Sequence, residues 1–386
     1  MNAELDHIMK ITERPSPVMV EGSGSWLRDR DGKHYLDFVQ GWAVNSLGHS
    51  PRVVLDALTA QGSRLINCSP AYYNEPMARL AGLLCEASGL DQVFPCSSGA
   101  EANEGAIKLA RKWGARHRDG AYEIVTMHGS FHGRTLATMA ASGKAGWDDM
   151  FPPKVHGFRK VPLGDLDAVA GAITSRTAAV MLEPIQGEAG VFPAGDDYLR
   201  RLAALTKERG LLLIVDEIQT GIGRTGRFFG YQHAGISPDI VTVGKGIGGG
   251  VPLAALIASG PVSCFEYGDQ GGTFNGNPLM AAVGCAVVET VARPEFLEAV
   301  ASNGAYLMAR LRALAGELGH GEVRGRGLLQ ALELKGQDAK KVAAAALDHG
   351  LLLNAPRPDT LRFMPALTVS RDEIDQMLTI LKACLV

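Results

Sequence analysis

The chain has 386 residues, of which 46% are hydrophobic and 20% are charged. This is the composition of an ordinary soluble globular protein, and the length allows a large core and two domains. The formal net charge of −3 gives no sign of the basic surface that nucleic acids or acidic membranes attract.

The N-terminus has no basic region followed by an apolar run, so we expect no secretory signal. No window approaches the ~18 uninterrupted apolar residues of a membrane span. Six cysteines are scattered without CxxC or Cys/His metal spacing. We therefore expect reduced thiols, no metal site and a cytoplasmic location.

Four segments follow one another along the chain. Residues 1–22 are predicted to form an N-terminal arm, and residues 23–50 the first part of a small domain. The latter contains Asp31-Gly32 between alternating runs, which indicates a β-hairpin. Residues 51–285 are predicted to form a large cofactor-binding domain, and residues 286–386 the rest of the small domain.

Strand and helix patterns alternate from about residue 90 to 260. Helices are predicted at Ala100–Gly114 and Asp197–Arg209. Such alternation predicts an α/β fold with a mainly parallel sheet covered by helices on both faces, and ligands bind beyond the carboxyl ends of its strands. The candidate strands are Asp91–Cys96, Glu123–Met127, Ala178–Glu183, Leu211–Asp216, Ile240–Val243 and Ala254–Ala258.

The pattern changes after about residue 285 to that of a smaller α+β unit. A helical stretch from Leu279 to about Leu318 is expected to break near Pro294. A strand pair within 322–334, a helix over 339–349, a strand or loop over 361–367 and a final helix over 371–385 follow.

Lys245 stands among glycines directly after the apolar run Ile240–Val243. A lysine after a buried strand is costly unless it has a partner or a covalent role. Asp216 ends another apolar run, and a carboxylate there needs a cationic partner. An amine and an acid at two strand ends suggest a pyridoxal phosphate site, in which Gln219 donates to the ring oxygen. A surface-loop lysine and an aspartate capping the next helix are the alternatives.

Two further motifs follow predicted strands. Ser98-Gly99-Ala100 lies at a strand-to-helix junction, where a hydroxyl and free backbone N–H groups form an anion site for a phosphate. A plain helix cap completed by Glu101 is the alternative. Phe131 is placed to stack on a flat ring and Arg134 to clamp a carboxylate. Taken alone, a loop aromatic and a solvent-facing arginine explain this second motif as well.

Three more segments carry candidate ligand groups. Glu188 follows a strand, where a helix cap or a surface carboxylate is the alternative. Thr273 lies in a polar glycine loop beside Gly272 and is a candidate phosphate ligand. Arg362 is a candidate for a second carboxylate, and an ordinary salt-bridged arginine is its alternative.

The whole set resembles the class III pyridoxal-phosphate aminotransferases, and most closely those of the acetylornithine type. The resemblance runs from about Gly24 to the C-terminus. Its carriers are DGKHYLDFVQGWAVNSLGH, SSGAEANEGAIKLARKWG, SFHGRTLATM, EPIQGEAGV, LLIVDEIQTGIGRTG, DIVTVGKGIGGGVPLAA, GGTFNGNPL and LRFMPAL.

The resemblance implies a fold-type I homodimer with active sites at the subunit interface. Lys245 is then the Schiff-base lysine, Asp216 the partner of the pyridinium and Phe131 the stacking ring. Gln219 contacts the ring oxygen. Ser98, Gly99 and Ala100 hold the phosphate, helped by Thr273 of the other subunit. Arg134 binds the substrate carboxylate remote from the reacting amine.

The resemblance also implies a substrate switch, in which Glu188 masks Arg362 for the amine donor and frees it for 2-oxoglutarate. The expected reaction converts N2-acetyl-L-ornithine and 2-oxoglutarate to N-acetyl-L-glutamate 5-semialdehyde and L-glutamate, a step of arginine biosynthesis. Gly272 stands where acetylornithine enzymes often carry serine. Alternatives are ornithine, succinylornithine, 4-aminobutyrate or diaminopimelate donors, an aminomutase on the same fold, and a non-catalytic cofactor-binding regulator.

Overall fold

The computed structural model describes residues 3–385, so the first two residues of the predicted arm and Val386 lie outside it. Its main element is a seven-stranded sheet in the order β4-β12-β11-β10-β7-β5-β6. The strands are β4 (Gln92–Cys96), β5 (Glu123–Met127), β6 (Phe158–Val161), β7 (Thr177–Leu182), β10 (Leu212–Asp216), β11 (Ile240–Val243) and β12 (Ala254–Ala258).

The sheet is mainly parallel, as the alternating pattern predicted. β10 pairs in parallel with β7 and β11, and β5 does so with β6 and β7. β12 runs antiparallel to both β11 and β4, so β4 again points in the direction of β11. The one antiparallel strand was not foreseen, and neither was β6, whose short sequence Phe-Arg-Lys-Val has no continuous apolar run.

Both faces of the sheet are covered, which explains the continuous apolar runs in its strands. Along β10, Leu213 and Val215 enter one hydrophobic cluster, while Leu212 and Ile214 enter another on the opposite face. Helix α4 (Gly99–His117) packs on the second face, and α6 (Leu166–Ala172) and α7 (Asp196–Glu208) pack on the first.

The predicted break near Pro294 is present: α8 (Pro278–Val291) ends before it, and α9 (Pro294–Leu318) begins at this residue. The predicted strand pair and the last two helices also form. The C-terminal elements are β13 (Val323–Arg326), β14 (Leu329–Glu333), α10 (Ala339–Asp348), β15 (Leu351–Leu352), β16 (Asn354–Arg357), β17 (Thr360–Phe363) and α11 (Arg371–Leu385).

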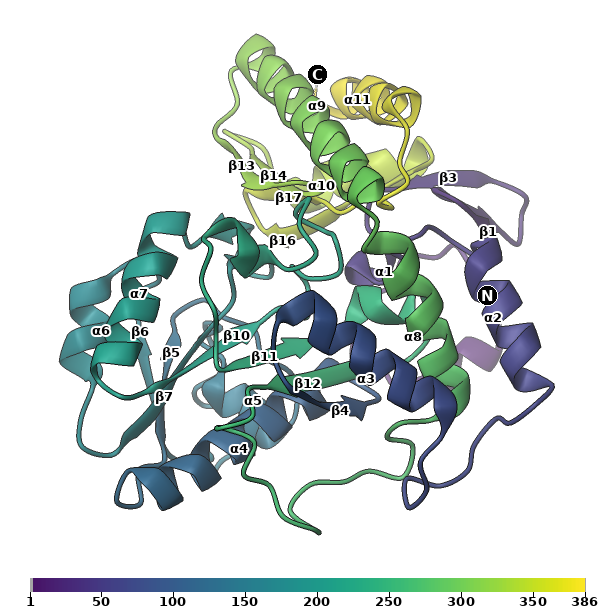
Figure 1. Ribbon diagram of the computed structural model, residues 1–386. Coiled ribbons are helices and arrows are strands. Elements are labelled where there is room, and N and C mark those ends of the chain that lie inside the picture. Colours follow the sequence, from purple (N-terminus) through teal and green to yellow (C-terminus); the bar gives the residue numbers. More distant parts are fainter. Residues whose placement is uncertain (1–2, 386) are drawn as a thin grey trace.

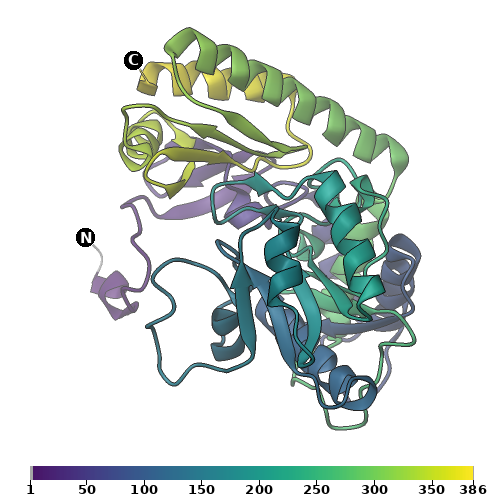
Figure 2. The same ribbon diagram turned by 90° about the vertical axis from the view of Figure 1, so that its left-hand side faces the viewer.

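The N-terminal hairpin lies beside these C-terminal elements rather than beside the large sheet (Figures 1 and 2). Strands β1 (Met19–Ser23), β2 (Trp26–Asp29) and β3 (His34–Asp37) form one sheet with β15, which pairs in parallel with β3. An N-terminal segment and a C-terminal strand of the chain therefore share one small sheet, separate from the seven-stranded sheet.

The remaining elements connect these layers. They are η1 (Ala3–His7), α1 (Gln40–Ala43), α2 (Arg52–Gly62), α3 (Glu75–Ser88), α5 (Leu136–Ala141), β8 (Ile185–Gln186), β9 (Phe192–Pro193), η2 (Gly230–His233) and η3 (Lys245–Gly248). Within residues 3–385, no helix combines the length and the apolar character needed to cross a bilayer.

Two glycines in α9 differ sharply in what surrounds them. A Cβ on Gly304 would lie 2.6 Å from the backbone of Gly327, whereas a Cβ on Gly316 would meet nothing within 4 Å. Gly304→Ala should therefore destabilise the protein by about 1–3 kcal/mol through overpacking. Gly316→Ala, the matched control, should leave stability unchanged or raise it by up to about 1 kcal/mol, because alanine is the better helix former.

Urea denaturation of both variants measures the difference. Equal effects of the two substitutions would show that the approach of α9 to Gly327 is looser than described.

Candidate active site

A cavity of about 270 Å³ opens at the carboxyl edge of the large sheet. Its walls come from the segments that follow β4, β5, β7, β10 and β11, which is where ligands bind in sheets of this kind. The predicted site residues among its lining are Gly99, Ala100, Phe131, Arg134, Glu188, Asp216, Gln219 and Lys245.

Lys245 is the first residue of η3, directly after β11. Its φ of +46° is left-handed, which costs a non-glycine residue about 1–2 kcal/mol. Such strain is typical of functional positions held by their surroundings. Burial lowers the pKa of the Lys245 ammonium, and the nearby Arg362 lowers it further against the attraction of Glu188. The amine is therefore easier to deprotonate than that of a surface lysine.

Asp216 ends β10 and is 3% exposed. Its Oδ2 accepts hydrogen bonds from Asn103 Nδ2 at 2.8 Å and His132 Nδ1 at 2.7 Å, and its Oδ1 accepts one from the Ile218 N–H. Asn103 also accepts a bond from the Thr242 hydroxyl on β11. Four segments of the fold thus fix the position of one carboxylate.

Sequence analysis assigned no role to Asn103, His132 or Thr242. His132 lies inside the motif that was singled out for Phe131 and Arg134. No acidic residue stands next to it in the sequence, so nothing local indicated a carboxylate partner for its ring. Asn103 is fully buried within α4, and its position among the buried Ala102 and Ala106 was the only available signal. A polar residue on the buried face of a helix needs a partner, and the partner is 113 positions away.

The N-terminus of α4 forms the capping box that was the alternative for Ser98. Ser98 Oγ accepts the Glu101 N–H, and Glu101 Oε2 accepts the N–H groups of Ser97 and Ser98. Gly99 and Ala100 occupy the first two helical positions, whose N–H groups have no partner within a helix. Both line the cavity, so the cap and an anion site are compatible.

Phe131 and Glu183 both line the cavity and are joined by a hydrogen bond. The Phe131 N–H donates to Glu183 Oε2 at 3.2 Å. Burial raises the pKa of Glu183 well above its usual range, and the neighbouring Asp216 raises it further. Two carboxyl groups in one buried region thus favour the protonated form of Glu183.

Arg362 on β17 is fully buried and paired with Glu188, Nη1 to Oε1 at 2.7 Å. Its Nε donates to Asn354 Oδ1 at 2.9 Å, and Nη1 also reaches Gln219 Oε1 at 3.4 Å. Burial raises the pKa of Glu188, but the charges of Arg362 and Lys245 outweigh it and hold that pKa low. The pair joins β17 of the C-terminal sheet to the segment between β8 and β9.

Several polar atoms at this site are buried without a partner among the described residues: Arg362 Nη2, Gln219 Nε2 and His132 Nε2. Buried polar groups in proteins are nearly always satisfied. Gln219 Nε2 and Arg362 Nη2 are donors. These two donors fit ligands that bring an acceptor oxygen to Gln219 and a carboxylate to Arg362.

A left-handed turn lies beside Arg362. Gln40, Gly41, Trp42 and Ala43 in α1 all have φ between +49° and +66°. The guanidinium of Arg362 lies 5.6 Å from the centre of the Trp42 ring, which is 47% exposed. This strained turn therefore carries an exposed aromatic residue to the arginine of the site.

Four of the predicted residues do not line the cavity: Ser98, Gly272, Thr273 and Arg362, the last of which reaches it through Glu188 and Gln219. Thr273 is exposed on the loop that precedes α8. A side chain at Gly272 would meet Asn275 at 2.7 Å, so the glycine permits this close approach.

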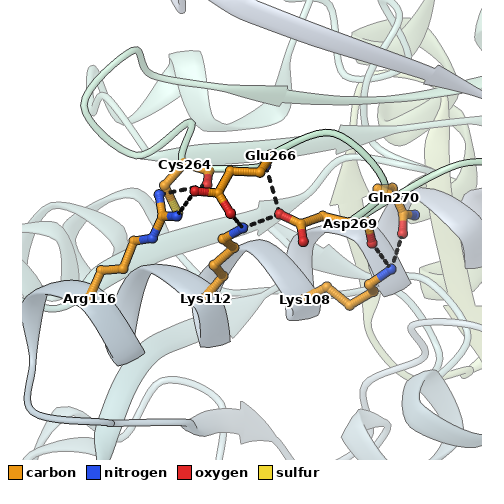
Figure 3. A network of polar contacts seen from close by, with 7 residues as sticks. All are labelled: Lys108, Lys112, Arg116, Cys264, Glu266, Asp269 and Gln270. Carbon is orange, nitrogen blue, oxygen red and sulfur yellow. Dashed lines mark hydrogen bonds and ion pairs between the residues drawn. The ribbon is translucent and has the colours of Figure 1, made fainter.

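The loop that leads to Gly272 is anchored to the outer face of α4 (Figure 3). Lys108, Lys112 and Arg116 lie on successive turns of this helix. Lys112 pairs with Glu266 at 2.9 Å and with Asp269, while Arg116 pairs with Glu266 and donates to the Cys264 carbonyl. One helix thus carries the candidate anion site at its N-terminus and holds the Thr273 loop by its side.

Glu217 is a second buried acid next to Asp216, and it points away from the cavity. It accepts bonds from the Thr220 hydroxyl at 2.6 Å and the Tyr231 N–H at 2.7 Å. Burial raises its pKa to about 7, although these bonds oppose the shift.

Comparison with known protein families identifies one whose model covers nearly the whole chain, including the residues of the cavity. A family model described as "Aminotransferase class-III" matches residues 9–385. The chain is 58% identical over 385 residues to the acetylornithine aminotransferase of Ralstonia nicotianae, covering 98% of this chain and 96% of that protein. It is 55% identical over 378 residues to acetylornithine aminotransferase 2 of Bordetella bronchiseptica, covering 97% and 96%.

Solved structures show the same fold. The ornithine aminotransferase of Toxoplasma gondii superposes with a TM-score of 0.94 at 31% identity, covering 99% of this chain and 93% of that one. The N-acetylornithine aminotransferase of Stenotrophomonas maltophilia gives 0.84 at 35% identity, covering 96% of each chain. Backbone similarity therefore does not separate the two donors, because both classes share it.

The raised pKa of Glu217 has a testable consequence for stability. The folded protein holds the Glu217 proton up to about pH 7, whereas the unfolded chain releases it near pH 4.5. Stability from this group is complete below about pH 4.5 and is lost as the pH rises to about 7, by up to about 3 kcal/mol.

Relative to the wild type, Glu217→Gln should gain stability between pH 5 and pH 8 in urea denaturation. A constant difference between the two proteins across this range would refute the assignment.

Proposed function

Since the chain belongs to the class III aminotransferase family, whose members are pyridoxal-phosphate-dependent transaminases, we propose that it transfers the δ-amino group of N2-acetyl-L-ornithine to 2-oxoglutarate. The products are N-acetyl-L-glutamate 5-semialdehyde and L-glutamate, and the reaction belongs to arginine biosynthesis in the cytoplasm. Full-length identity of 55–58% to acetylornithine aminotransferases is the observation that carries this choice of donor.

The residues of the cavity fit pyridoxal phosphate. The buried Asp216 offers an anion to the pyridinium nitrogen, and Gln219 offers an otherwise unpaired Nε2–H to the ring oxygen. Gly99 and Ala100 offer N–H groups to the phosphate at the positive end of α4. Phe131 would lie against the ring, and Lys245 would attach the cofactor through its amine.

When bound, pyridoxal phosphate supplies a carbonyl that captures an amine and a ring that withdraws electrons from the adjacent carbon. The chain supplies the proton transfers and the orientation. Lys245, with its lowered pKa, would be the base that removes a proton from the δ-carbon of the donor and the acid that then delivers this proton to the cofactor. Asn103 and His132 hold the Asp216 carboxylate in place, so that it would be available to the pyridinium nitrogen.

Arg134 would bind the carboxylate of acetylornithine remote from the reacting amine. The Glu188–Arg362 pair would admit the two substrates in turn. While the pair is closed, Arg362 presents no free charge to the uncharged δ-carbon end of the donor. When Glu188 moves away, Arg362 becomes a bidentate site for the α-carboxylate of 2-oxoglutarate. The unpaired Arg362 Nη2 supports this role.

The proposed enzyme is a homodimer in which Thr273 of one subunit reaches the phosphate held by the other. Exposed apolar side chains on two touching loops support this arrangement. Ile66 is 60% and Tyr73 96% exposed on one loop, and Phe274 is 64% exposed on the other. Asn74 Nδ2 donates to the Gly276 carbonyl between the loops at 2.9 Å. Sedimentation as a single chain would contradict the dimer.

Alternative donors are separated by a panel assayed with 2-oxoglutarate: acetylornithine, succinylornithine, ornithine, 4-aminobutyrate and diaminopimelate. We expect acetylornithine to give the highest kcat/KM. A clear preference for ornithine or 4-aminobutyrate would overturn the choice of donor, and product formation without any oxo acid would favour an aminomutase.

Lys245→Ala tests the reaction type. We expect at least a thousandfold loss of kcat, because both proton transfers lose their base, a loss on the order of that found for covalent catalytic residues. The variant should keep the unfolding midpoint of the wild type to within a few degrees, which serves as its control. Wild-type turnover by this variant would exclude the scheme.

Glu188→Gln tests the switch. Glutamine cannot neutralise Arg362, so the arginine stays available to an α-carboxylate. We expect the ratio of kcat/KM for glutamate to that for acetylornithine to rise by about tenfold or more, the effect of one charged contact. An unchanged ratio would show that Glu188 does not gate Arg362.

A further inference from the structure

Two cations and two aromatic rings gather beside the cavity, and two of these four residues, Phe131 and Arg134, line it. The rings of Phe131 and Trp147 lie 5.5 Å apart between centroids, and Trp147 is buried. The Arg134 guanidinium lies 6.0 Å from the Phe131 ring and 5.5 Å from that of Trp147. The Lys144 ammonium lies at nearly the same distances, 5.9 Å and 5.4 Å.

Both cations lie over the same two rings. Among residues 3–385, neither the Arg134 side chain nor the Lys144 side chain forms a hydrogen bond or an ion pair. Other lysines near Trp147 differ: Lys160 pairs with Asp148, and Lys154 donates to the Trp147 carbonyl. Like charges repel at close range, and the aromatic faces offset only part of this repulsion. An anion bound between them would remove it.

Lys144 lies beside the wall of the cavity, because its ammonium lies over the ring of Phe131, which lines that cavity. Its side chain is partly buried, and its charge contributes to the low pKa of Glu188, which lines the cavity. A lysine on an open surface is the ordinary alternative, and its charge would be screened by solvent at this distance. Lys144 therefore matches Arg134 in its distances from the same two rings.

We propose that Lys144 is a specificity-determining residue that binds, together with Arg134, the substrate carboxylate remote from the reacting carbon. The inference rests on the proposed transamination and adds a second cation to the site assigned to Arg134. It selects substrates with a carboxylate at the distal end. In the donor this is the α-carboxylate of acetylornithine, and in the acceptor the γ-carboxylate of 2-oxoglutarate.

The pair of cations serves both half-reactions, unlike Arg362. Arg362 is masked by Glu188 at 2.7 Å and acts only once that pair opens, whereas Arg134 and Lys144 have no acid to displace. Loss of Lys144 should therefore weaken the donor and the acceptor alike. A change in Glu188 should instead shift the balance between them, which distinguishes the two sites.

A pair of donors that differ only in the carboxylate tests the proposal. N-Acetylputrescine is N2-acetylornithine without that group. We expect Lys144→Met to raise the KM for acetylornithine and for 2-oxoglutarate by roughly tenfold with kcat little changed, as for one charge-assisted contact. The kcat/KM for N-acetylputrescine, followed in the half-reaction without acceptor, should change less than twofold.

Lys144→Arg keeps the charge and should retain most of the affinity for acetylornithine. Lys340→Met removes an exposed lysine on α10, whose only ion pair is at 3.8 Å, and controls for the change of net charge. Equal effects of Lys144→Met on both donors, or no effect on either, would overturn the inference.

The test of Lys144 can be made whichever amine donor the wild type uses. If the wild type uses ornithine rather than acetylornithine, the proposed donor is wrong. The same comparison made with ornithine and putrescine then tests Lys144.

Discussion

The carboxylate of Asp216 is the charge on which the rest of the site depends. It is buried at the end of β10, where an isolated anion costs several kcal/mol or more. The fold offsets this cost with donors from α4, from the loop after β5 and from its own chain. These donors hold the carboxylate in place without neutralising its charge. The attraction that remains is available to a cation, and the proposed pyridinium is one that fits the cavity.

The other ionisable groups are arranged so that this charge is not cancelled. Burial and the neighbouring Asp216 raise the pKa of Glu183, and Glu188 is paired with Arg362. Lys245 lines the same cavity as these acids, and burial lowers the pKa of its ammonium. A lysine that gives up its proton readily serves as a base near neutral pH. The same burial that makes Asp216 costly thus makes Lys245 reactive.

The substrate end of the site has a different character. Arg134 and Lys144 lie over aromatic rings beside the cavity, whereas Arg362 is fully buried and paired. In the proposed scheme, the two cations without an acidic partner bind the distal carboxylate of either substrate. The paired Arg362 distinguishes the amine donor from the oxo-acid acceptor. Helix α4 links these parts to the proposed dimer, since it presents the phosphate site at one end and anchors the loop of Thr273 along its side.

The sequence by itself determined the main parts of the fold: the alternating strands, the break at Pro294 and the terminal helix follow from local periodicity and from proline. It also identified Lys245 and Asp216, because a charge after an apolar run stands out locally. Only the tertiary structure revealed Asn103 and His132 as partners of Asp216, and Lys144 over the same two rings as Arg134. The pairing of Glu188 with Arg362 was expected from the family resemblance and not from any local pattern. Asp216 lies 113 positions from Asn103 and 84 from His132, and no local pattern records which distant side chain a buried charge will meet.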